Sequence, residues 1–142
     1  MGDRVPAAFK EALRVIRAAL SPAGIDWALT GSTSFALQGV PVTPADIDIQ
    51  TDEPGAYAIA RLLAAYVVRP VVFSRTEQVC SHFGGLVIAG VAVEVMGALQ
   101  KRLPDGVWEP PVNVVQHRRW ITFEGRPLPV LDLAYEIRAY RL

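Results

Sequence analysis

The segment Asp46-Ile47-Asp48-Ile49-Gln50-Thr51 alternates polar side chains with isoleucine. Residues two apart on a β-strand point to the same side, so Asp46 and Asp48 share one face while Ile47 and Ile49 point into a core. Two carboxylates held this close repel each other. A divalent cation between them removes that repulsion, and Mg²⁺ binds through one or two carboxylates while keeping positions for water and phosphate. The segment therefore predicts a strand that carries a Mg²⁺ site for a phosphorylated ligand.

A glycine-serine pair, Gly31-Ser32, precedes the first aspartate by fourteen residues. The apolar run over 26–30 predicts a short buried strand before the pair, and residues 32–38 predict a short helix that ends at Gly39. Gly31 lets the backbone approach a phosphate closely, and Ser32 opens a helix whose first amides attract anions. Strand, Gly-Ser, helix and a strand with Asp-x-Asp together indicate a phosphate-binding arrangement.

A third carboxylate, Glu94, stands in the β-branched run over 91–96, where it is the sole charge. An unpaired charge within a sheet is costly, so Glu94 needs a partner, and a metal ion shared with the two aspartates would serve. Two alternatives are that Glu94 faces water from an edge strand and that it pairs with an arginine.

Asp46 also has an alternative interpretation as part of a helix start. Thr43 would then be the N-cap, Pro44 the first helical residue and Asp46 the third. The strict alternation that follows, and the proline at position 54, argue against a helix there.

Composition limits the class of protein. The chain has 142 residues, of which 51% are hydrophobic, and 14 basic residues balance 14 acidic ones. We expect a single domain over residues 1–142 with a substantial core. The balanced charge argues against a long nucleic acid as partner, because phosphate contacts would require a basic excess. Residues 1–10 do not form a signal peptide, no uncharged run reaches the roughly 18 residues of a membrane span, and Cys80 has no disulfide partner, so we expect a cytoplasmic protein.

The remaining elements follow from periodicity and turn residues. Helical spacing predicts helices over 6–20, 54–66 and 131–142, the second capped by Asp52 with Ile59, Leu62 and Leu63 facing inward. β-branched runs predict strands over 67–74, 79–89, 91–96, 112–116 and 120–123. Gly84-Gly85 indicates a bulge or a close approach, and residues 104–106 a turn. The sum is an α+β or α/β domain, with a mixed β-sheet flanked by helices.

These motifs resemble the nucleotidyltransferase superfamily, whose fold is shared by DNA polymerase beta, CCA-adding enzymes and antibiotic adenylyltransferases. The pattern of that family is Gly-Ser at a helix start, Asp-x-Asp about a dozen residues later, and a third acid on a later strand. Gly31, Ser32, Asp46, Asp48 and Glu94 stand at those places. The stretch over 29–40 is most similar to the aminoglycoside and lincosamide adenylyltransferase branch and its uncharacterised minimal relatives, as are the segments over 94–97, 105–109 and 129–136.

The resemblance implies a minimal nucleotidyltransferase fold and an enzyme that moves a nucleoside monophosphate, AMP if the donor is ATP, from a nucleoside triphosphate to a hydroxyl with release of pyrophosphate. Gly31 and Ser32 would bind the triphosphate. Asp46, Asp48 and Glu94 would be the catalytic residues and would hold one or two Mg²⁺ (or Mn²⁺), with Glu94 nearest the attacking hydroxyl. The acceptor stays open between a small molecule, a transfer RNA and a protein side chain, and the chain would act without a membrane, with or without a protein partner or a second copy.

A different class of function remains open. A minimal domain of this kind can be a nucleotide-binding module without turnover, such as the small partner of a toxin–antitoxin pair. A domain that has lost nucleotide binding is a third alternative, against which the retained acids argue.

Other residues carry weaker signals. Cys80 and His82 share a strand face and are a potential soft-metal pair, although no second cysteine completes a zinc site. Arg75, Lys101 and Arg102 are candidates to contact a triphosphate, and spacing does not select among them. The basic segment over 117–120 fits a base-stacking or phosphate-steering role, or simply a solvated edge.

Overall fold

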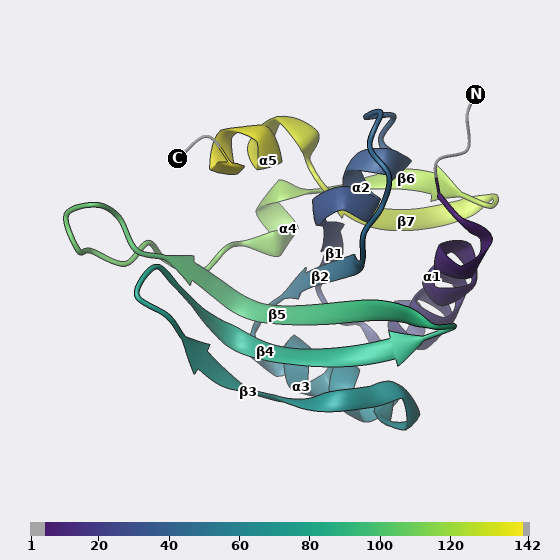
Figure 1. Ribbon diagram of the computed structural model, residues 1–142, viewed down its shortest axis with the longest axis horizontal. Helices are drawn as coiled ribbons and strands as arrows, with labels where there is room; N and C mark the ends of the chain where they lie inside the picture. The colour runs from purple at the N-terminus through teal and green to yellow at the C-terminus, as the bar shows by residue number, and fades with distance from the viewer. Residues whose placement is uncertain (1–4, 141–142) are drawn as a thin grey trace.

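A seven-stranded mixed sheet organises the chain in the computed structural model, which describes residues 5–140 (Figure 1). The strands lie in the order β3-β4-β5-β2-β1-β7-β6. Their bounds are β1 (Trp27–Thr30), β2 (Ile47–Thr51), β3 (Val67–Arg75), β4 (Val79–Ile88), β5 (Val91–Lys101), β6 (Arg118–Phe123) and β7 (Arg126–Leu131). The helices are α1 (Ala7–Leu20), α2 (Gly31–Leu37), α3 (Glu53–Leu62), α4 (Val114–His117) and α5 (Leu133–Tyr140), with 3₁₀ turns η1 (Ser21–Ala23) and η2 (Ala64–Tyr66).

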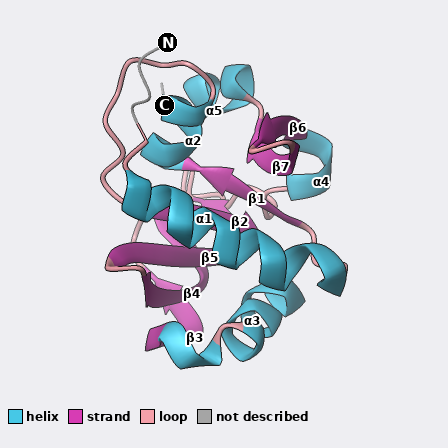
Figure 2. Ribbon diagram, turned by 90° about the vertical axis from the view of Figure 1, so that its right-hand side faces the viewer, coloured by secondary structure: helices cyan, strands magenta, loops and turns pink. Residues whose placement is uncertain are grey.

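Successive side chains along each strand point to opposite faces of this sheet. On β2, Ile47 and Ile49 are fully buried in the main core, together with apolar residues of α1 and α3. On β1, Leu29 joins that core while its neighbour Ala28 packs in a second cluster with Val114 of α4. Figures 1 and 2 show the consequence, with α1 and α3 on one side of the sheet and α5 on the other. The polar residues of β2 therefore face the side that carries α4 and α5.

The central position of β2 follows from its pairing. β2 is antiparallel to β1 and parallel to β5, so it has a strand on each side. The parallel connection passes through α3 and the β3–β4 hairpin before β5 returns beside β2. A residue on β2 is thereby held by two neighbours, which fixes its side chain more firmly than an edge strand would.

Most of the predicted elements are confirmed, including the mixed sheet, the capped helix at Asp52 and the turn over 104–106. The close approach predicted at Gly84 is also present, because a Cβ there would lie 2.6 Å from Cγ2 of Val71. Gly39 follows α2 with a φ of +91°, as expected of a helix-ending glycine.

Three local predictions are wrong. Leu62 is 47% exposed, because α3 ends there and the neighbouring Leu63 turns into the core instead. The segment over 112–116 is not a strand: the Asn113 side chain accepts a hydrogen bond from the amide of Gln116 (3.0 Å) and so starts α4. The last helix begins at Leu133 rather than at 131, because Asp132 caps it by accepting from the Tyr135 amide (3.1 Å). Residues 141–142 of that prediction lie outside the described residues.

The strand β7 was not predicted, since it contains Pro127 and Pro129. Residues two apart on a strand point their N–H groups to the same side, so both missing donors fall on one side of β7. β7 still pairs with β6 along its whole length, and Leu128 and Val130 are fully buried.

The N-cap of α3 is a point where a single side chain supports the helix that covers the core. Asp52 accepts a hydrogen bond from the Gly55 amide at 2.7 Å. We expect Asp52→Ala to lower the free energy of unfolding by about 0.5–2 kcal/mol, because it leaves this amide without its partner. Asp52→Asn keeps the accepting oxygen and should lose much less. Urea unfolding of the three proteins measures the difference, and equal losses in both variants would contradict the capping role.

Among residues 5–140, each helix is too short or too polar to span a lipid bilayer.

Candidate metal and nucleotide site

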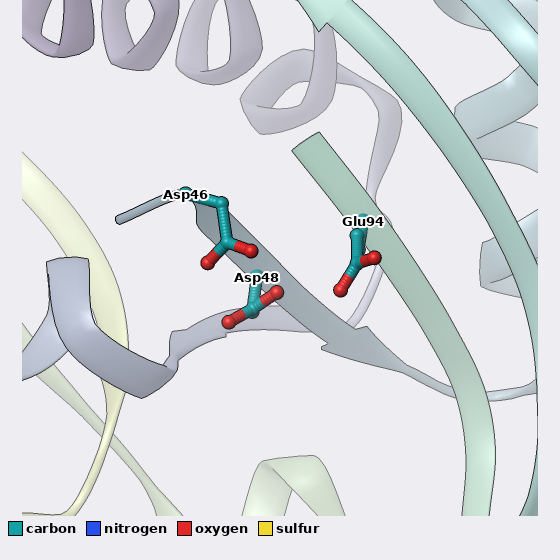
Figure 3. Close-up of side chains that lie close together, drawn as sticks. All are labelled: Asp46, Asp48 and Glu94. Carbon is teal, nitrogen blue, oxygen red and sulfur yellow. The ribbon is translucent and has the colours of Figure 1, made fainter. Parts of the chain in front are cut away.

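The three predicted acids meet on the face of the sheet opposite the main core. Asp48 of β2 and Glu94 of β5 are direct partners in the parallel register, and Asp46 immediately precedes β2. One carboxylate oxygen from each residue lies within 4.8 Å of the others, and all three side chains are half-buried. Figure 3 shows the three carboxyl groups close to one another, with Asp46 and Asp48 at β2 and Glu94 on β5. Within residues 5–140, no other group of three or more acidic, histidine or cysteine ligands comes together in this way.

The acids are electrostatically unfavourable without a cation. Burial, and after it the charges of Asp46 and Glu94, raise the pKa of Asp48 to about 8. A carboxyl that resists ionisation beside two others is the expected result of like charges sharing a site. An oxygen-only ligand set of this size fits Mg²⁺ or Mn²⁺ and does not fit a soft metal. The residues present therefore suit the divalent cation that the sequence predicts.

The alternative interpretations of these acids do not hold. Residues 43–46 form no helix, so Asp46 is not a helix-start residue. Glu94 is not on an edge strand, because β5 lies between β4 and β2. Its registered partner on β2 is Asp48, and none of the ion pairs among the described residues joins Glu94 to an arginine.

The glycine-serine pair lies directly beside the aspartates. Gly31 opens α2 with a φ of +74°, and a Cβ at this position would come within 2.5 Å of Asp48 Oδ2. Ser32 Oγ accepts a hydrogen bond from the Ala45 amide (3.0 Å), and Thr33 Oγ1 donates one to the Asp46 carbonyl (2.6 Å). The first turn of α2 thus holds the chain that enters β2, and it fixes where Asp46 and Asp48 stand relative to Gly31.

A fourth acid, Glu136 of α5, was not found from the sequence. It is 2% exposed, and its Oε2 accepts from Thr30 Oγ1 (2.5 Å) and from the Gly31 amide (3.4 Å). Burial raises its pKa, and the hydrogen bonds from Thr30 and Gly31 oppose that shift. In the sequence Glu136 looks like an ordinary helix charge; the signal that identifies it is the packing of α5 over the end of β1.

A cavity of about 220 Å³ is lined by three of the four acids, all but Asp46. It is lined by Asp48 and Glu94 on the sheet, by Glu136 on α5 and by Lys101 at the end of β5. A larger hollow of about 1040 Å³ lies between α1 and the β6–β7 hairpin and contains none of the four acids. The smaller cavity is therefore the one that Asp48, Glu94 and Glu136 share.

The predicted cations are separated by the fold. Lys101 lines the cavity and donates to the Ala139 carbonyl at 3.1 Å. Arg75 instead stacks over Trp108 (5.1 Å), and Arg102 donates to the Gly106 carbonyl (3.1 Å). Of the three candidates, Lys101 is the one that lies beside the acids.

The other sequence candidates have structural partners. Cys80 donates to Gln100 Oε1 (3.6 Å), whereas His82 contacts the Tyr57 hydroxyl (2.8 Å), and a register irregularity of the β4–β5 pairing lies between them. In the segment over 117–120, the His117 ring stacks on the Tyr135 ring. A guanidinium nitrogen of Arg118 lies 3.6 Å from a carboxylate oxygen of Asp26.

Comparison with known proteins agrees with the geometry. A family model described as aminoglycoside-2''-adenylyltransferase matches residues 12–141. The chain is also similar to a crystal structure of TM1012 from Thermotoga maritima, described as a candidate nucleotidyltransferase. The two are 49% identical with a TM-score of 0.93, and the match covers 96% of this chain and 85% of that one. A search of curated proteins gave no match.

Proposed function

The chain belongs to the aminoglycoside-2''-adenylyltransferase family of nucleotidyltransferases, and from that premise we propose that it is a Mg²⁺-dependent enzyme of a single domain. It transfers a nucleoside monophosphate, AMP from ATP, to a hydroxyl acceptor and releases pyrophosphate. Membership of this family does not identify the acceptor that this chain uses. We propose a cytoplasmic location, in line with the lone cysteine.

One observation carries this proposal. Asp46, Asp48 and Glu94 place three carboxylate oxygens within 4.8 Å of one another beside the first turn of α2. These three residues would hold Mg²⁺, which supplies positive charge to the phosphoryl oxygens and to the attacking oxygen. Without a cation, the arrangement only costs stability, since the pKa of Asp48 rises to about 8.

Each residue has a proposed task that follows from its position. Asp46, immediately before β2, and Asp48 on β2 would hold the metal ion with their carboxylates. Glu94, on β5 opposite Asp48, would be the carboxylate nearest the acceptor hydroxyl and would help to take up its proton. Gly31 and Ser32 bind the triphosphate, the first because the absence of a side chain leaves room next to Asp48 Oδ2. Most of the rate then comes from position and electrostatics rather than from covalent chemistry.

Nucleotide binding is the direct test. We expect one of the four ribonucleoside triphosphates, ATP in the first instance, to raise the melting temperature in the presence of Mg²⁺, because a ligand that binds the folded state stabilises it by mass action. The shift should disappear without Mg²⁺ and in Asp46→Asn. Glu77→Gln, which removes an exposed charge at the β3–β4 turn, is the matched control and should behave like the wild type.

Release of pyrophosphate separates the two classes of function. Mg²⁺-dependent binding followed by pyrophosphate release with an acceptor supports the enzyme. Binding without any turnover, in isolation or with a co-purified partner, would support the nucleotide-binding module instead. A folded protein that binds none of the four nucleotides would refute both.

A further inference from the structure

The face of the sheet that carries the three acids continues beyond them over β5, β4 and β3. Gly85 on β4 is the registered partner of Glu94, and Arg69 on β3 is the registered partner of Gly85. Directly opposed residues of antiparallel strands point to the same face of a sheet. Since Asp48 lies opposite Glu94 on β2, one row of positions crosses four neighbouring strands, with acids at one end and an arginine at the other.

The outer part of this face is apolar and open. Phe83 on β4 has Met96 on β5 and Val72 on β3 as registered partners, so these three side chains form a second row beside the first. Val72 is 57% exposed. Figure 1 shows α3 behind β3, β4 and β5, and among residues 5–140 no helix lies in front of these strands. An acceptor can therefore approach Glu94 along this surface.

The backbone of β3 is irregular at Arg69. The β3–β4 register shifts on both sides of this residue, between Val67 and Arg69 and between Arg69 and Val72. Bulges of this kind re-aim a side chain, and they are common at sheet edges and next to active sites. The Arg69 guanidinium lies over the Phe83 ring, 5.4 Å from its centroid. This cation–π contact holds the charge against the open face of the sheet.

The charge of Arg69 has no acidic partner in the part of the chain that the structure describes. No ion pair among residues 5–140 includes Arg69, and neither β3 nor β4 contains an acidic residue. Glu94 is two strands away, which separates the two backbones by about 10 Å. An arginine fork binds two oxygens of a carboxylate or a phosphate at once. Arg69 is therefore placed to receive one oxyanion from a ligand.

Gly85 keeps the strip between Glu94 and Arg69 free of side chains. A Cβ added to Gly85 would lie 3.6 Å from Arg69 Cβ and 3.9 Å from a backbone oxygen, which are ordinary van der Waals distances. At the neighbouring Gly84, by contrast, an added Cβ would clash with β3. Packing therefore requires glycine at position 84 and not at position 85, where the missing side chain leaves a passage from Glu94 to Arg69.

We propose that the acceptor is a small molecule with one oxyanion, which Arg69 binds while the molecule lies across Gly85 with its hydroxyl at Glu94. The proposal rests on the function proposed above and adds the class of acceptor to it. An apolar surface with a few convergent polar groups at its ends is a common form of small-molecule site.

The charges favour this class over two others. A nucleic acid needs several cations along its backbone, whereas this strip offers one arginine in a chain with 14 basic and 14 acidic residues. A polycation such as an aminoglycoside would meet a like charge at Arg69. A carboxylate and a phosphate have the same chemistry toward arginine, and the experiment distinguishes them.

The variants separate charge from space. Arg69→Gln removes the charge and keeps a polar side chain. Gly85→Leu fills the strip and leaves the charge in place. Arg75→Gln is the matched control, because Arg75 is on the same strand but lies over the Trp108 ring instead (5.1 Å). Circular dichroism and melting temperature establish that each variant is folded.

Ligand-observed NMR with three probes of one shape tests the proposal. The probes are 4-(hydroxymethyl)benzoate, its neutral amide and 4-(hydroxymethyl)benzylamine, each with α,β-methylene ATP and Mg²⁺. We expect the wild type and Arg75→Gln to bind the benzoate about tenfold or more tightly than the amide, because a charge-assisted contact is worth that factor. Arg69→Gln should abolish this preference, and Gly85→Leu should weaken the benzoate and the amide alike. Replacement of the benzoate by 4-(hydroxymethyl)phenyl phosphate shows which oxyanion binds more tightly.

Several results would overturn the anionic acceptor. They are equal or absent binding of the three probes to the wild type, tighter binding of the benzylamine, and a benzoate preference that persists in Arg69→Gln. Tighter binding of a short oligoribonucleotide than of the phenyl phosphate would assign the strip to a nucleic acid instead. Calorimetry with α,β-methylene ATP and Mg²⁺ alone tests the proposed function separately, and Arg69→Gln should leave that affinity unchanged. A loss of nucleotide affinity in Arg69→Gln would assign the arginine to the triphosphate and remove it from the acceptor.

Discussion

Asp48→Asn should lower nucleotidyl transfer by at least about a thousandfold and at the same time make the metal-free protein more stable. The loss of activity follows because a carboxylate ligand to Mg²⁺ contributes several kcal/mol of charge stabilisation in the transition state, and about 4 kcal/mol is a thousandfold in rate. The gain in stability follows because burial, and after it the charges of Asp46 and Glu94, raise the pKa of Asp48 to about 8. At neutral pH the wild type must therefore take up a proton when it folds, and the amide variant does not. If Asp48 served only in packing, its replacement would not lower activity while raising stability.

The raised pKa of Asp48 also predicts how the free energy of unfolding changes with pH. Asp48 has a folded pKa of about 8 against an ordinary value of 3.8. Below about pH 4, both states hold the proton and the shift has no effect. Between about pH 4 and 8, the unfolded state loses the proton while the folded state keeps it, so the free energy of unfolding falls as pH rises, and above pH 8 it levels off.

Urea unfolding at several pH values, in EDTA, measures this effect. The decline between pH 4 and 8 should be smaller in Asp48→Asn than in the wild type, and Glu77→Gln should follow the wild type. Addition of Mg²⁺ should stabilise the wild type above pH 7 and should stabilise the variant much less. An identical pH profile in wild type and Asp48→Asn would show that burial and the neighbouring acids do not raise the pKa of Asp48.

The part of the site that could be predicted is the part encoded by local periodicity. The alternation around Asp46 and Asp48 fixes their shared face, because a strand has a side-chain period of two. The partnership of Asp48 with Glu94 depends on a parallel pairing between strands more than forty residues apart, for which the local pattern gives no information. The sequence made Glu94 a candidate through its isolation among β-branched residues and through the resemblance to a family.

The residues that escaped prediction share a physical reason. Glu136 sits in a helix where a charge every few residues is ordinary, and only the contact of α5 with Thr30 shows that it is buried. Gln50 continues the polar alternation of β2, and nothing local says that its oxygen lacks a donor. Whether a polar atom is buried without a partner depends on tertiary packing, so local sequence patterns do not predict it.

Gly31→Ala should be far more damaging than the same change at another glycine with a similar backbone. Gly31 has a φ of +74°, and Gly24 has a φ of +70°. At Gly24 an added Cβ meets nothing within 4 Å, whereas at Gly31 it would lie 2.5 Å from Asp48 Oδ2. The left-handed backbone alone costs an alanine about 1–2 kcal/mol, so Gly24→Ala measures that cost without a clash.

The excess loss at Gly31 measures how closely α2 approaches the proposed metal ligand. We expect Gly31→Ala to lower the free energy of unfolding by about 2–4 kcal/mol, because the new methyl group must displace the Asp48 side chain or the first turn of α2. Since a shift of about 1 Å in a reacting group can cost a hundredfold in rate, transfer should fall by about that factor or more, while Gly24→Ala should keep its activity. The double variant Gly31→Ala/Asp48→Gly would remove the clash and should recover much of the stability but none of the activity. Equal losses of stability at the two glycines, or full activity in Gly31→Ala, would mean that the contact between Gly31 and Asp48 does not shape the site.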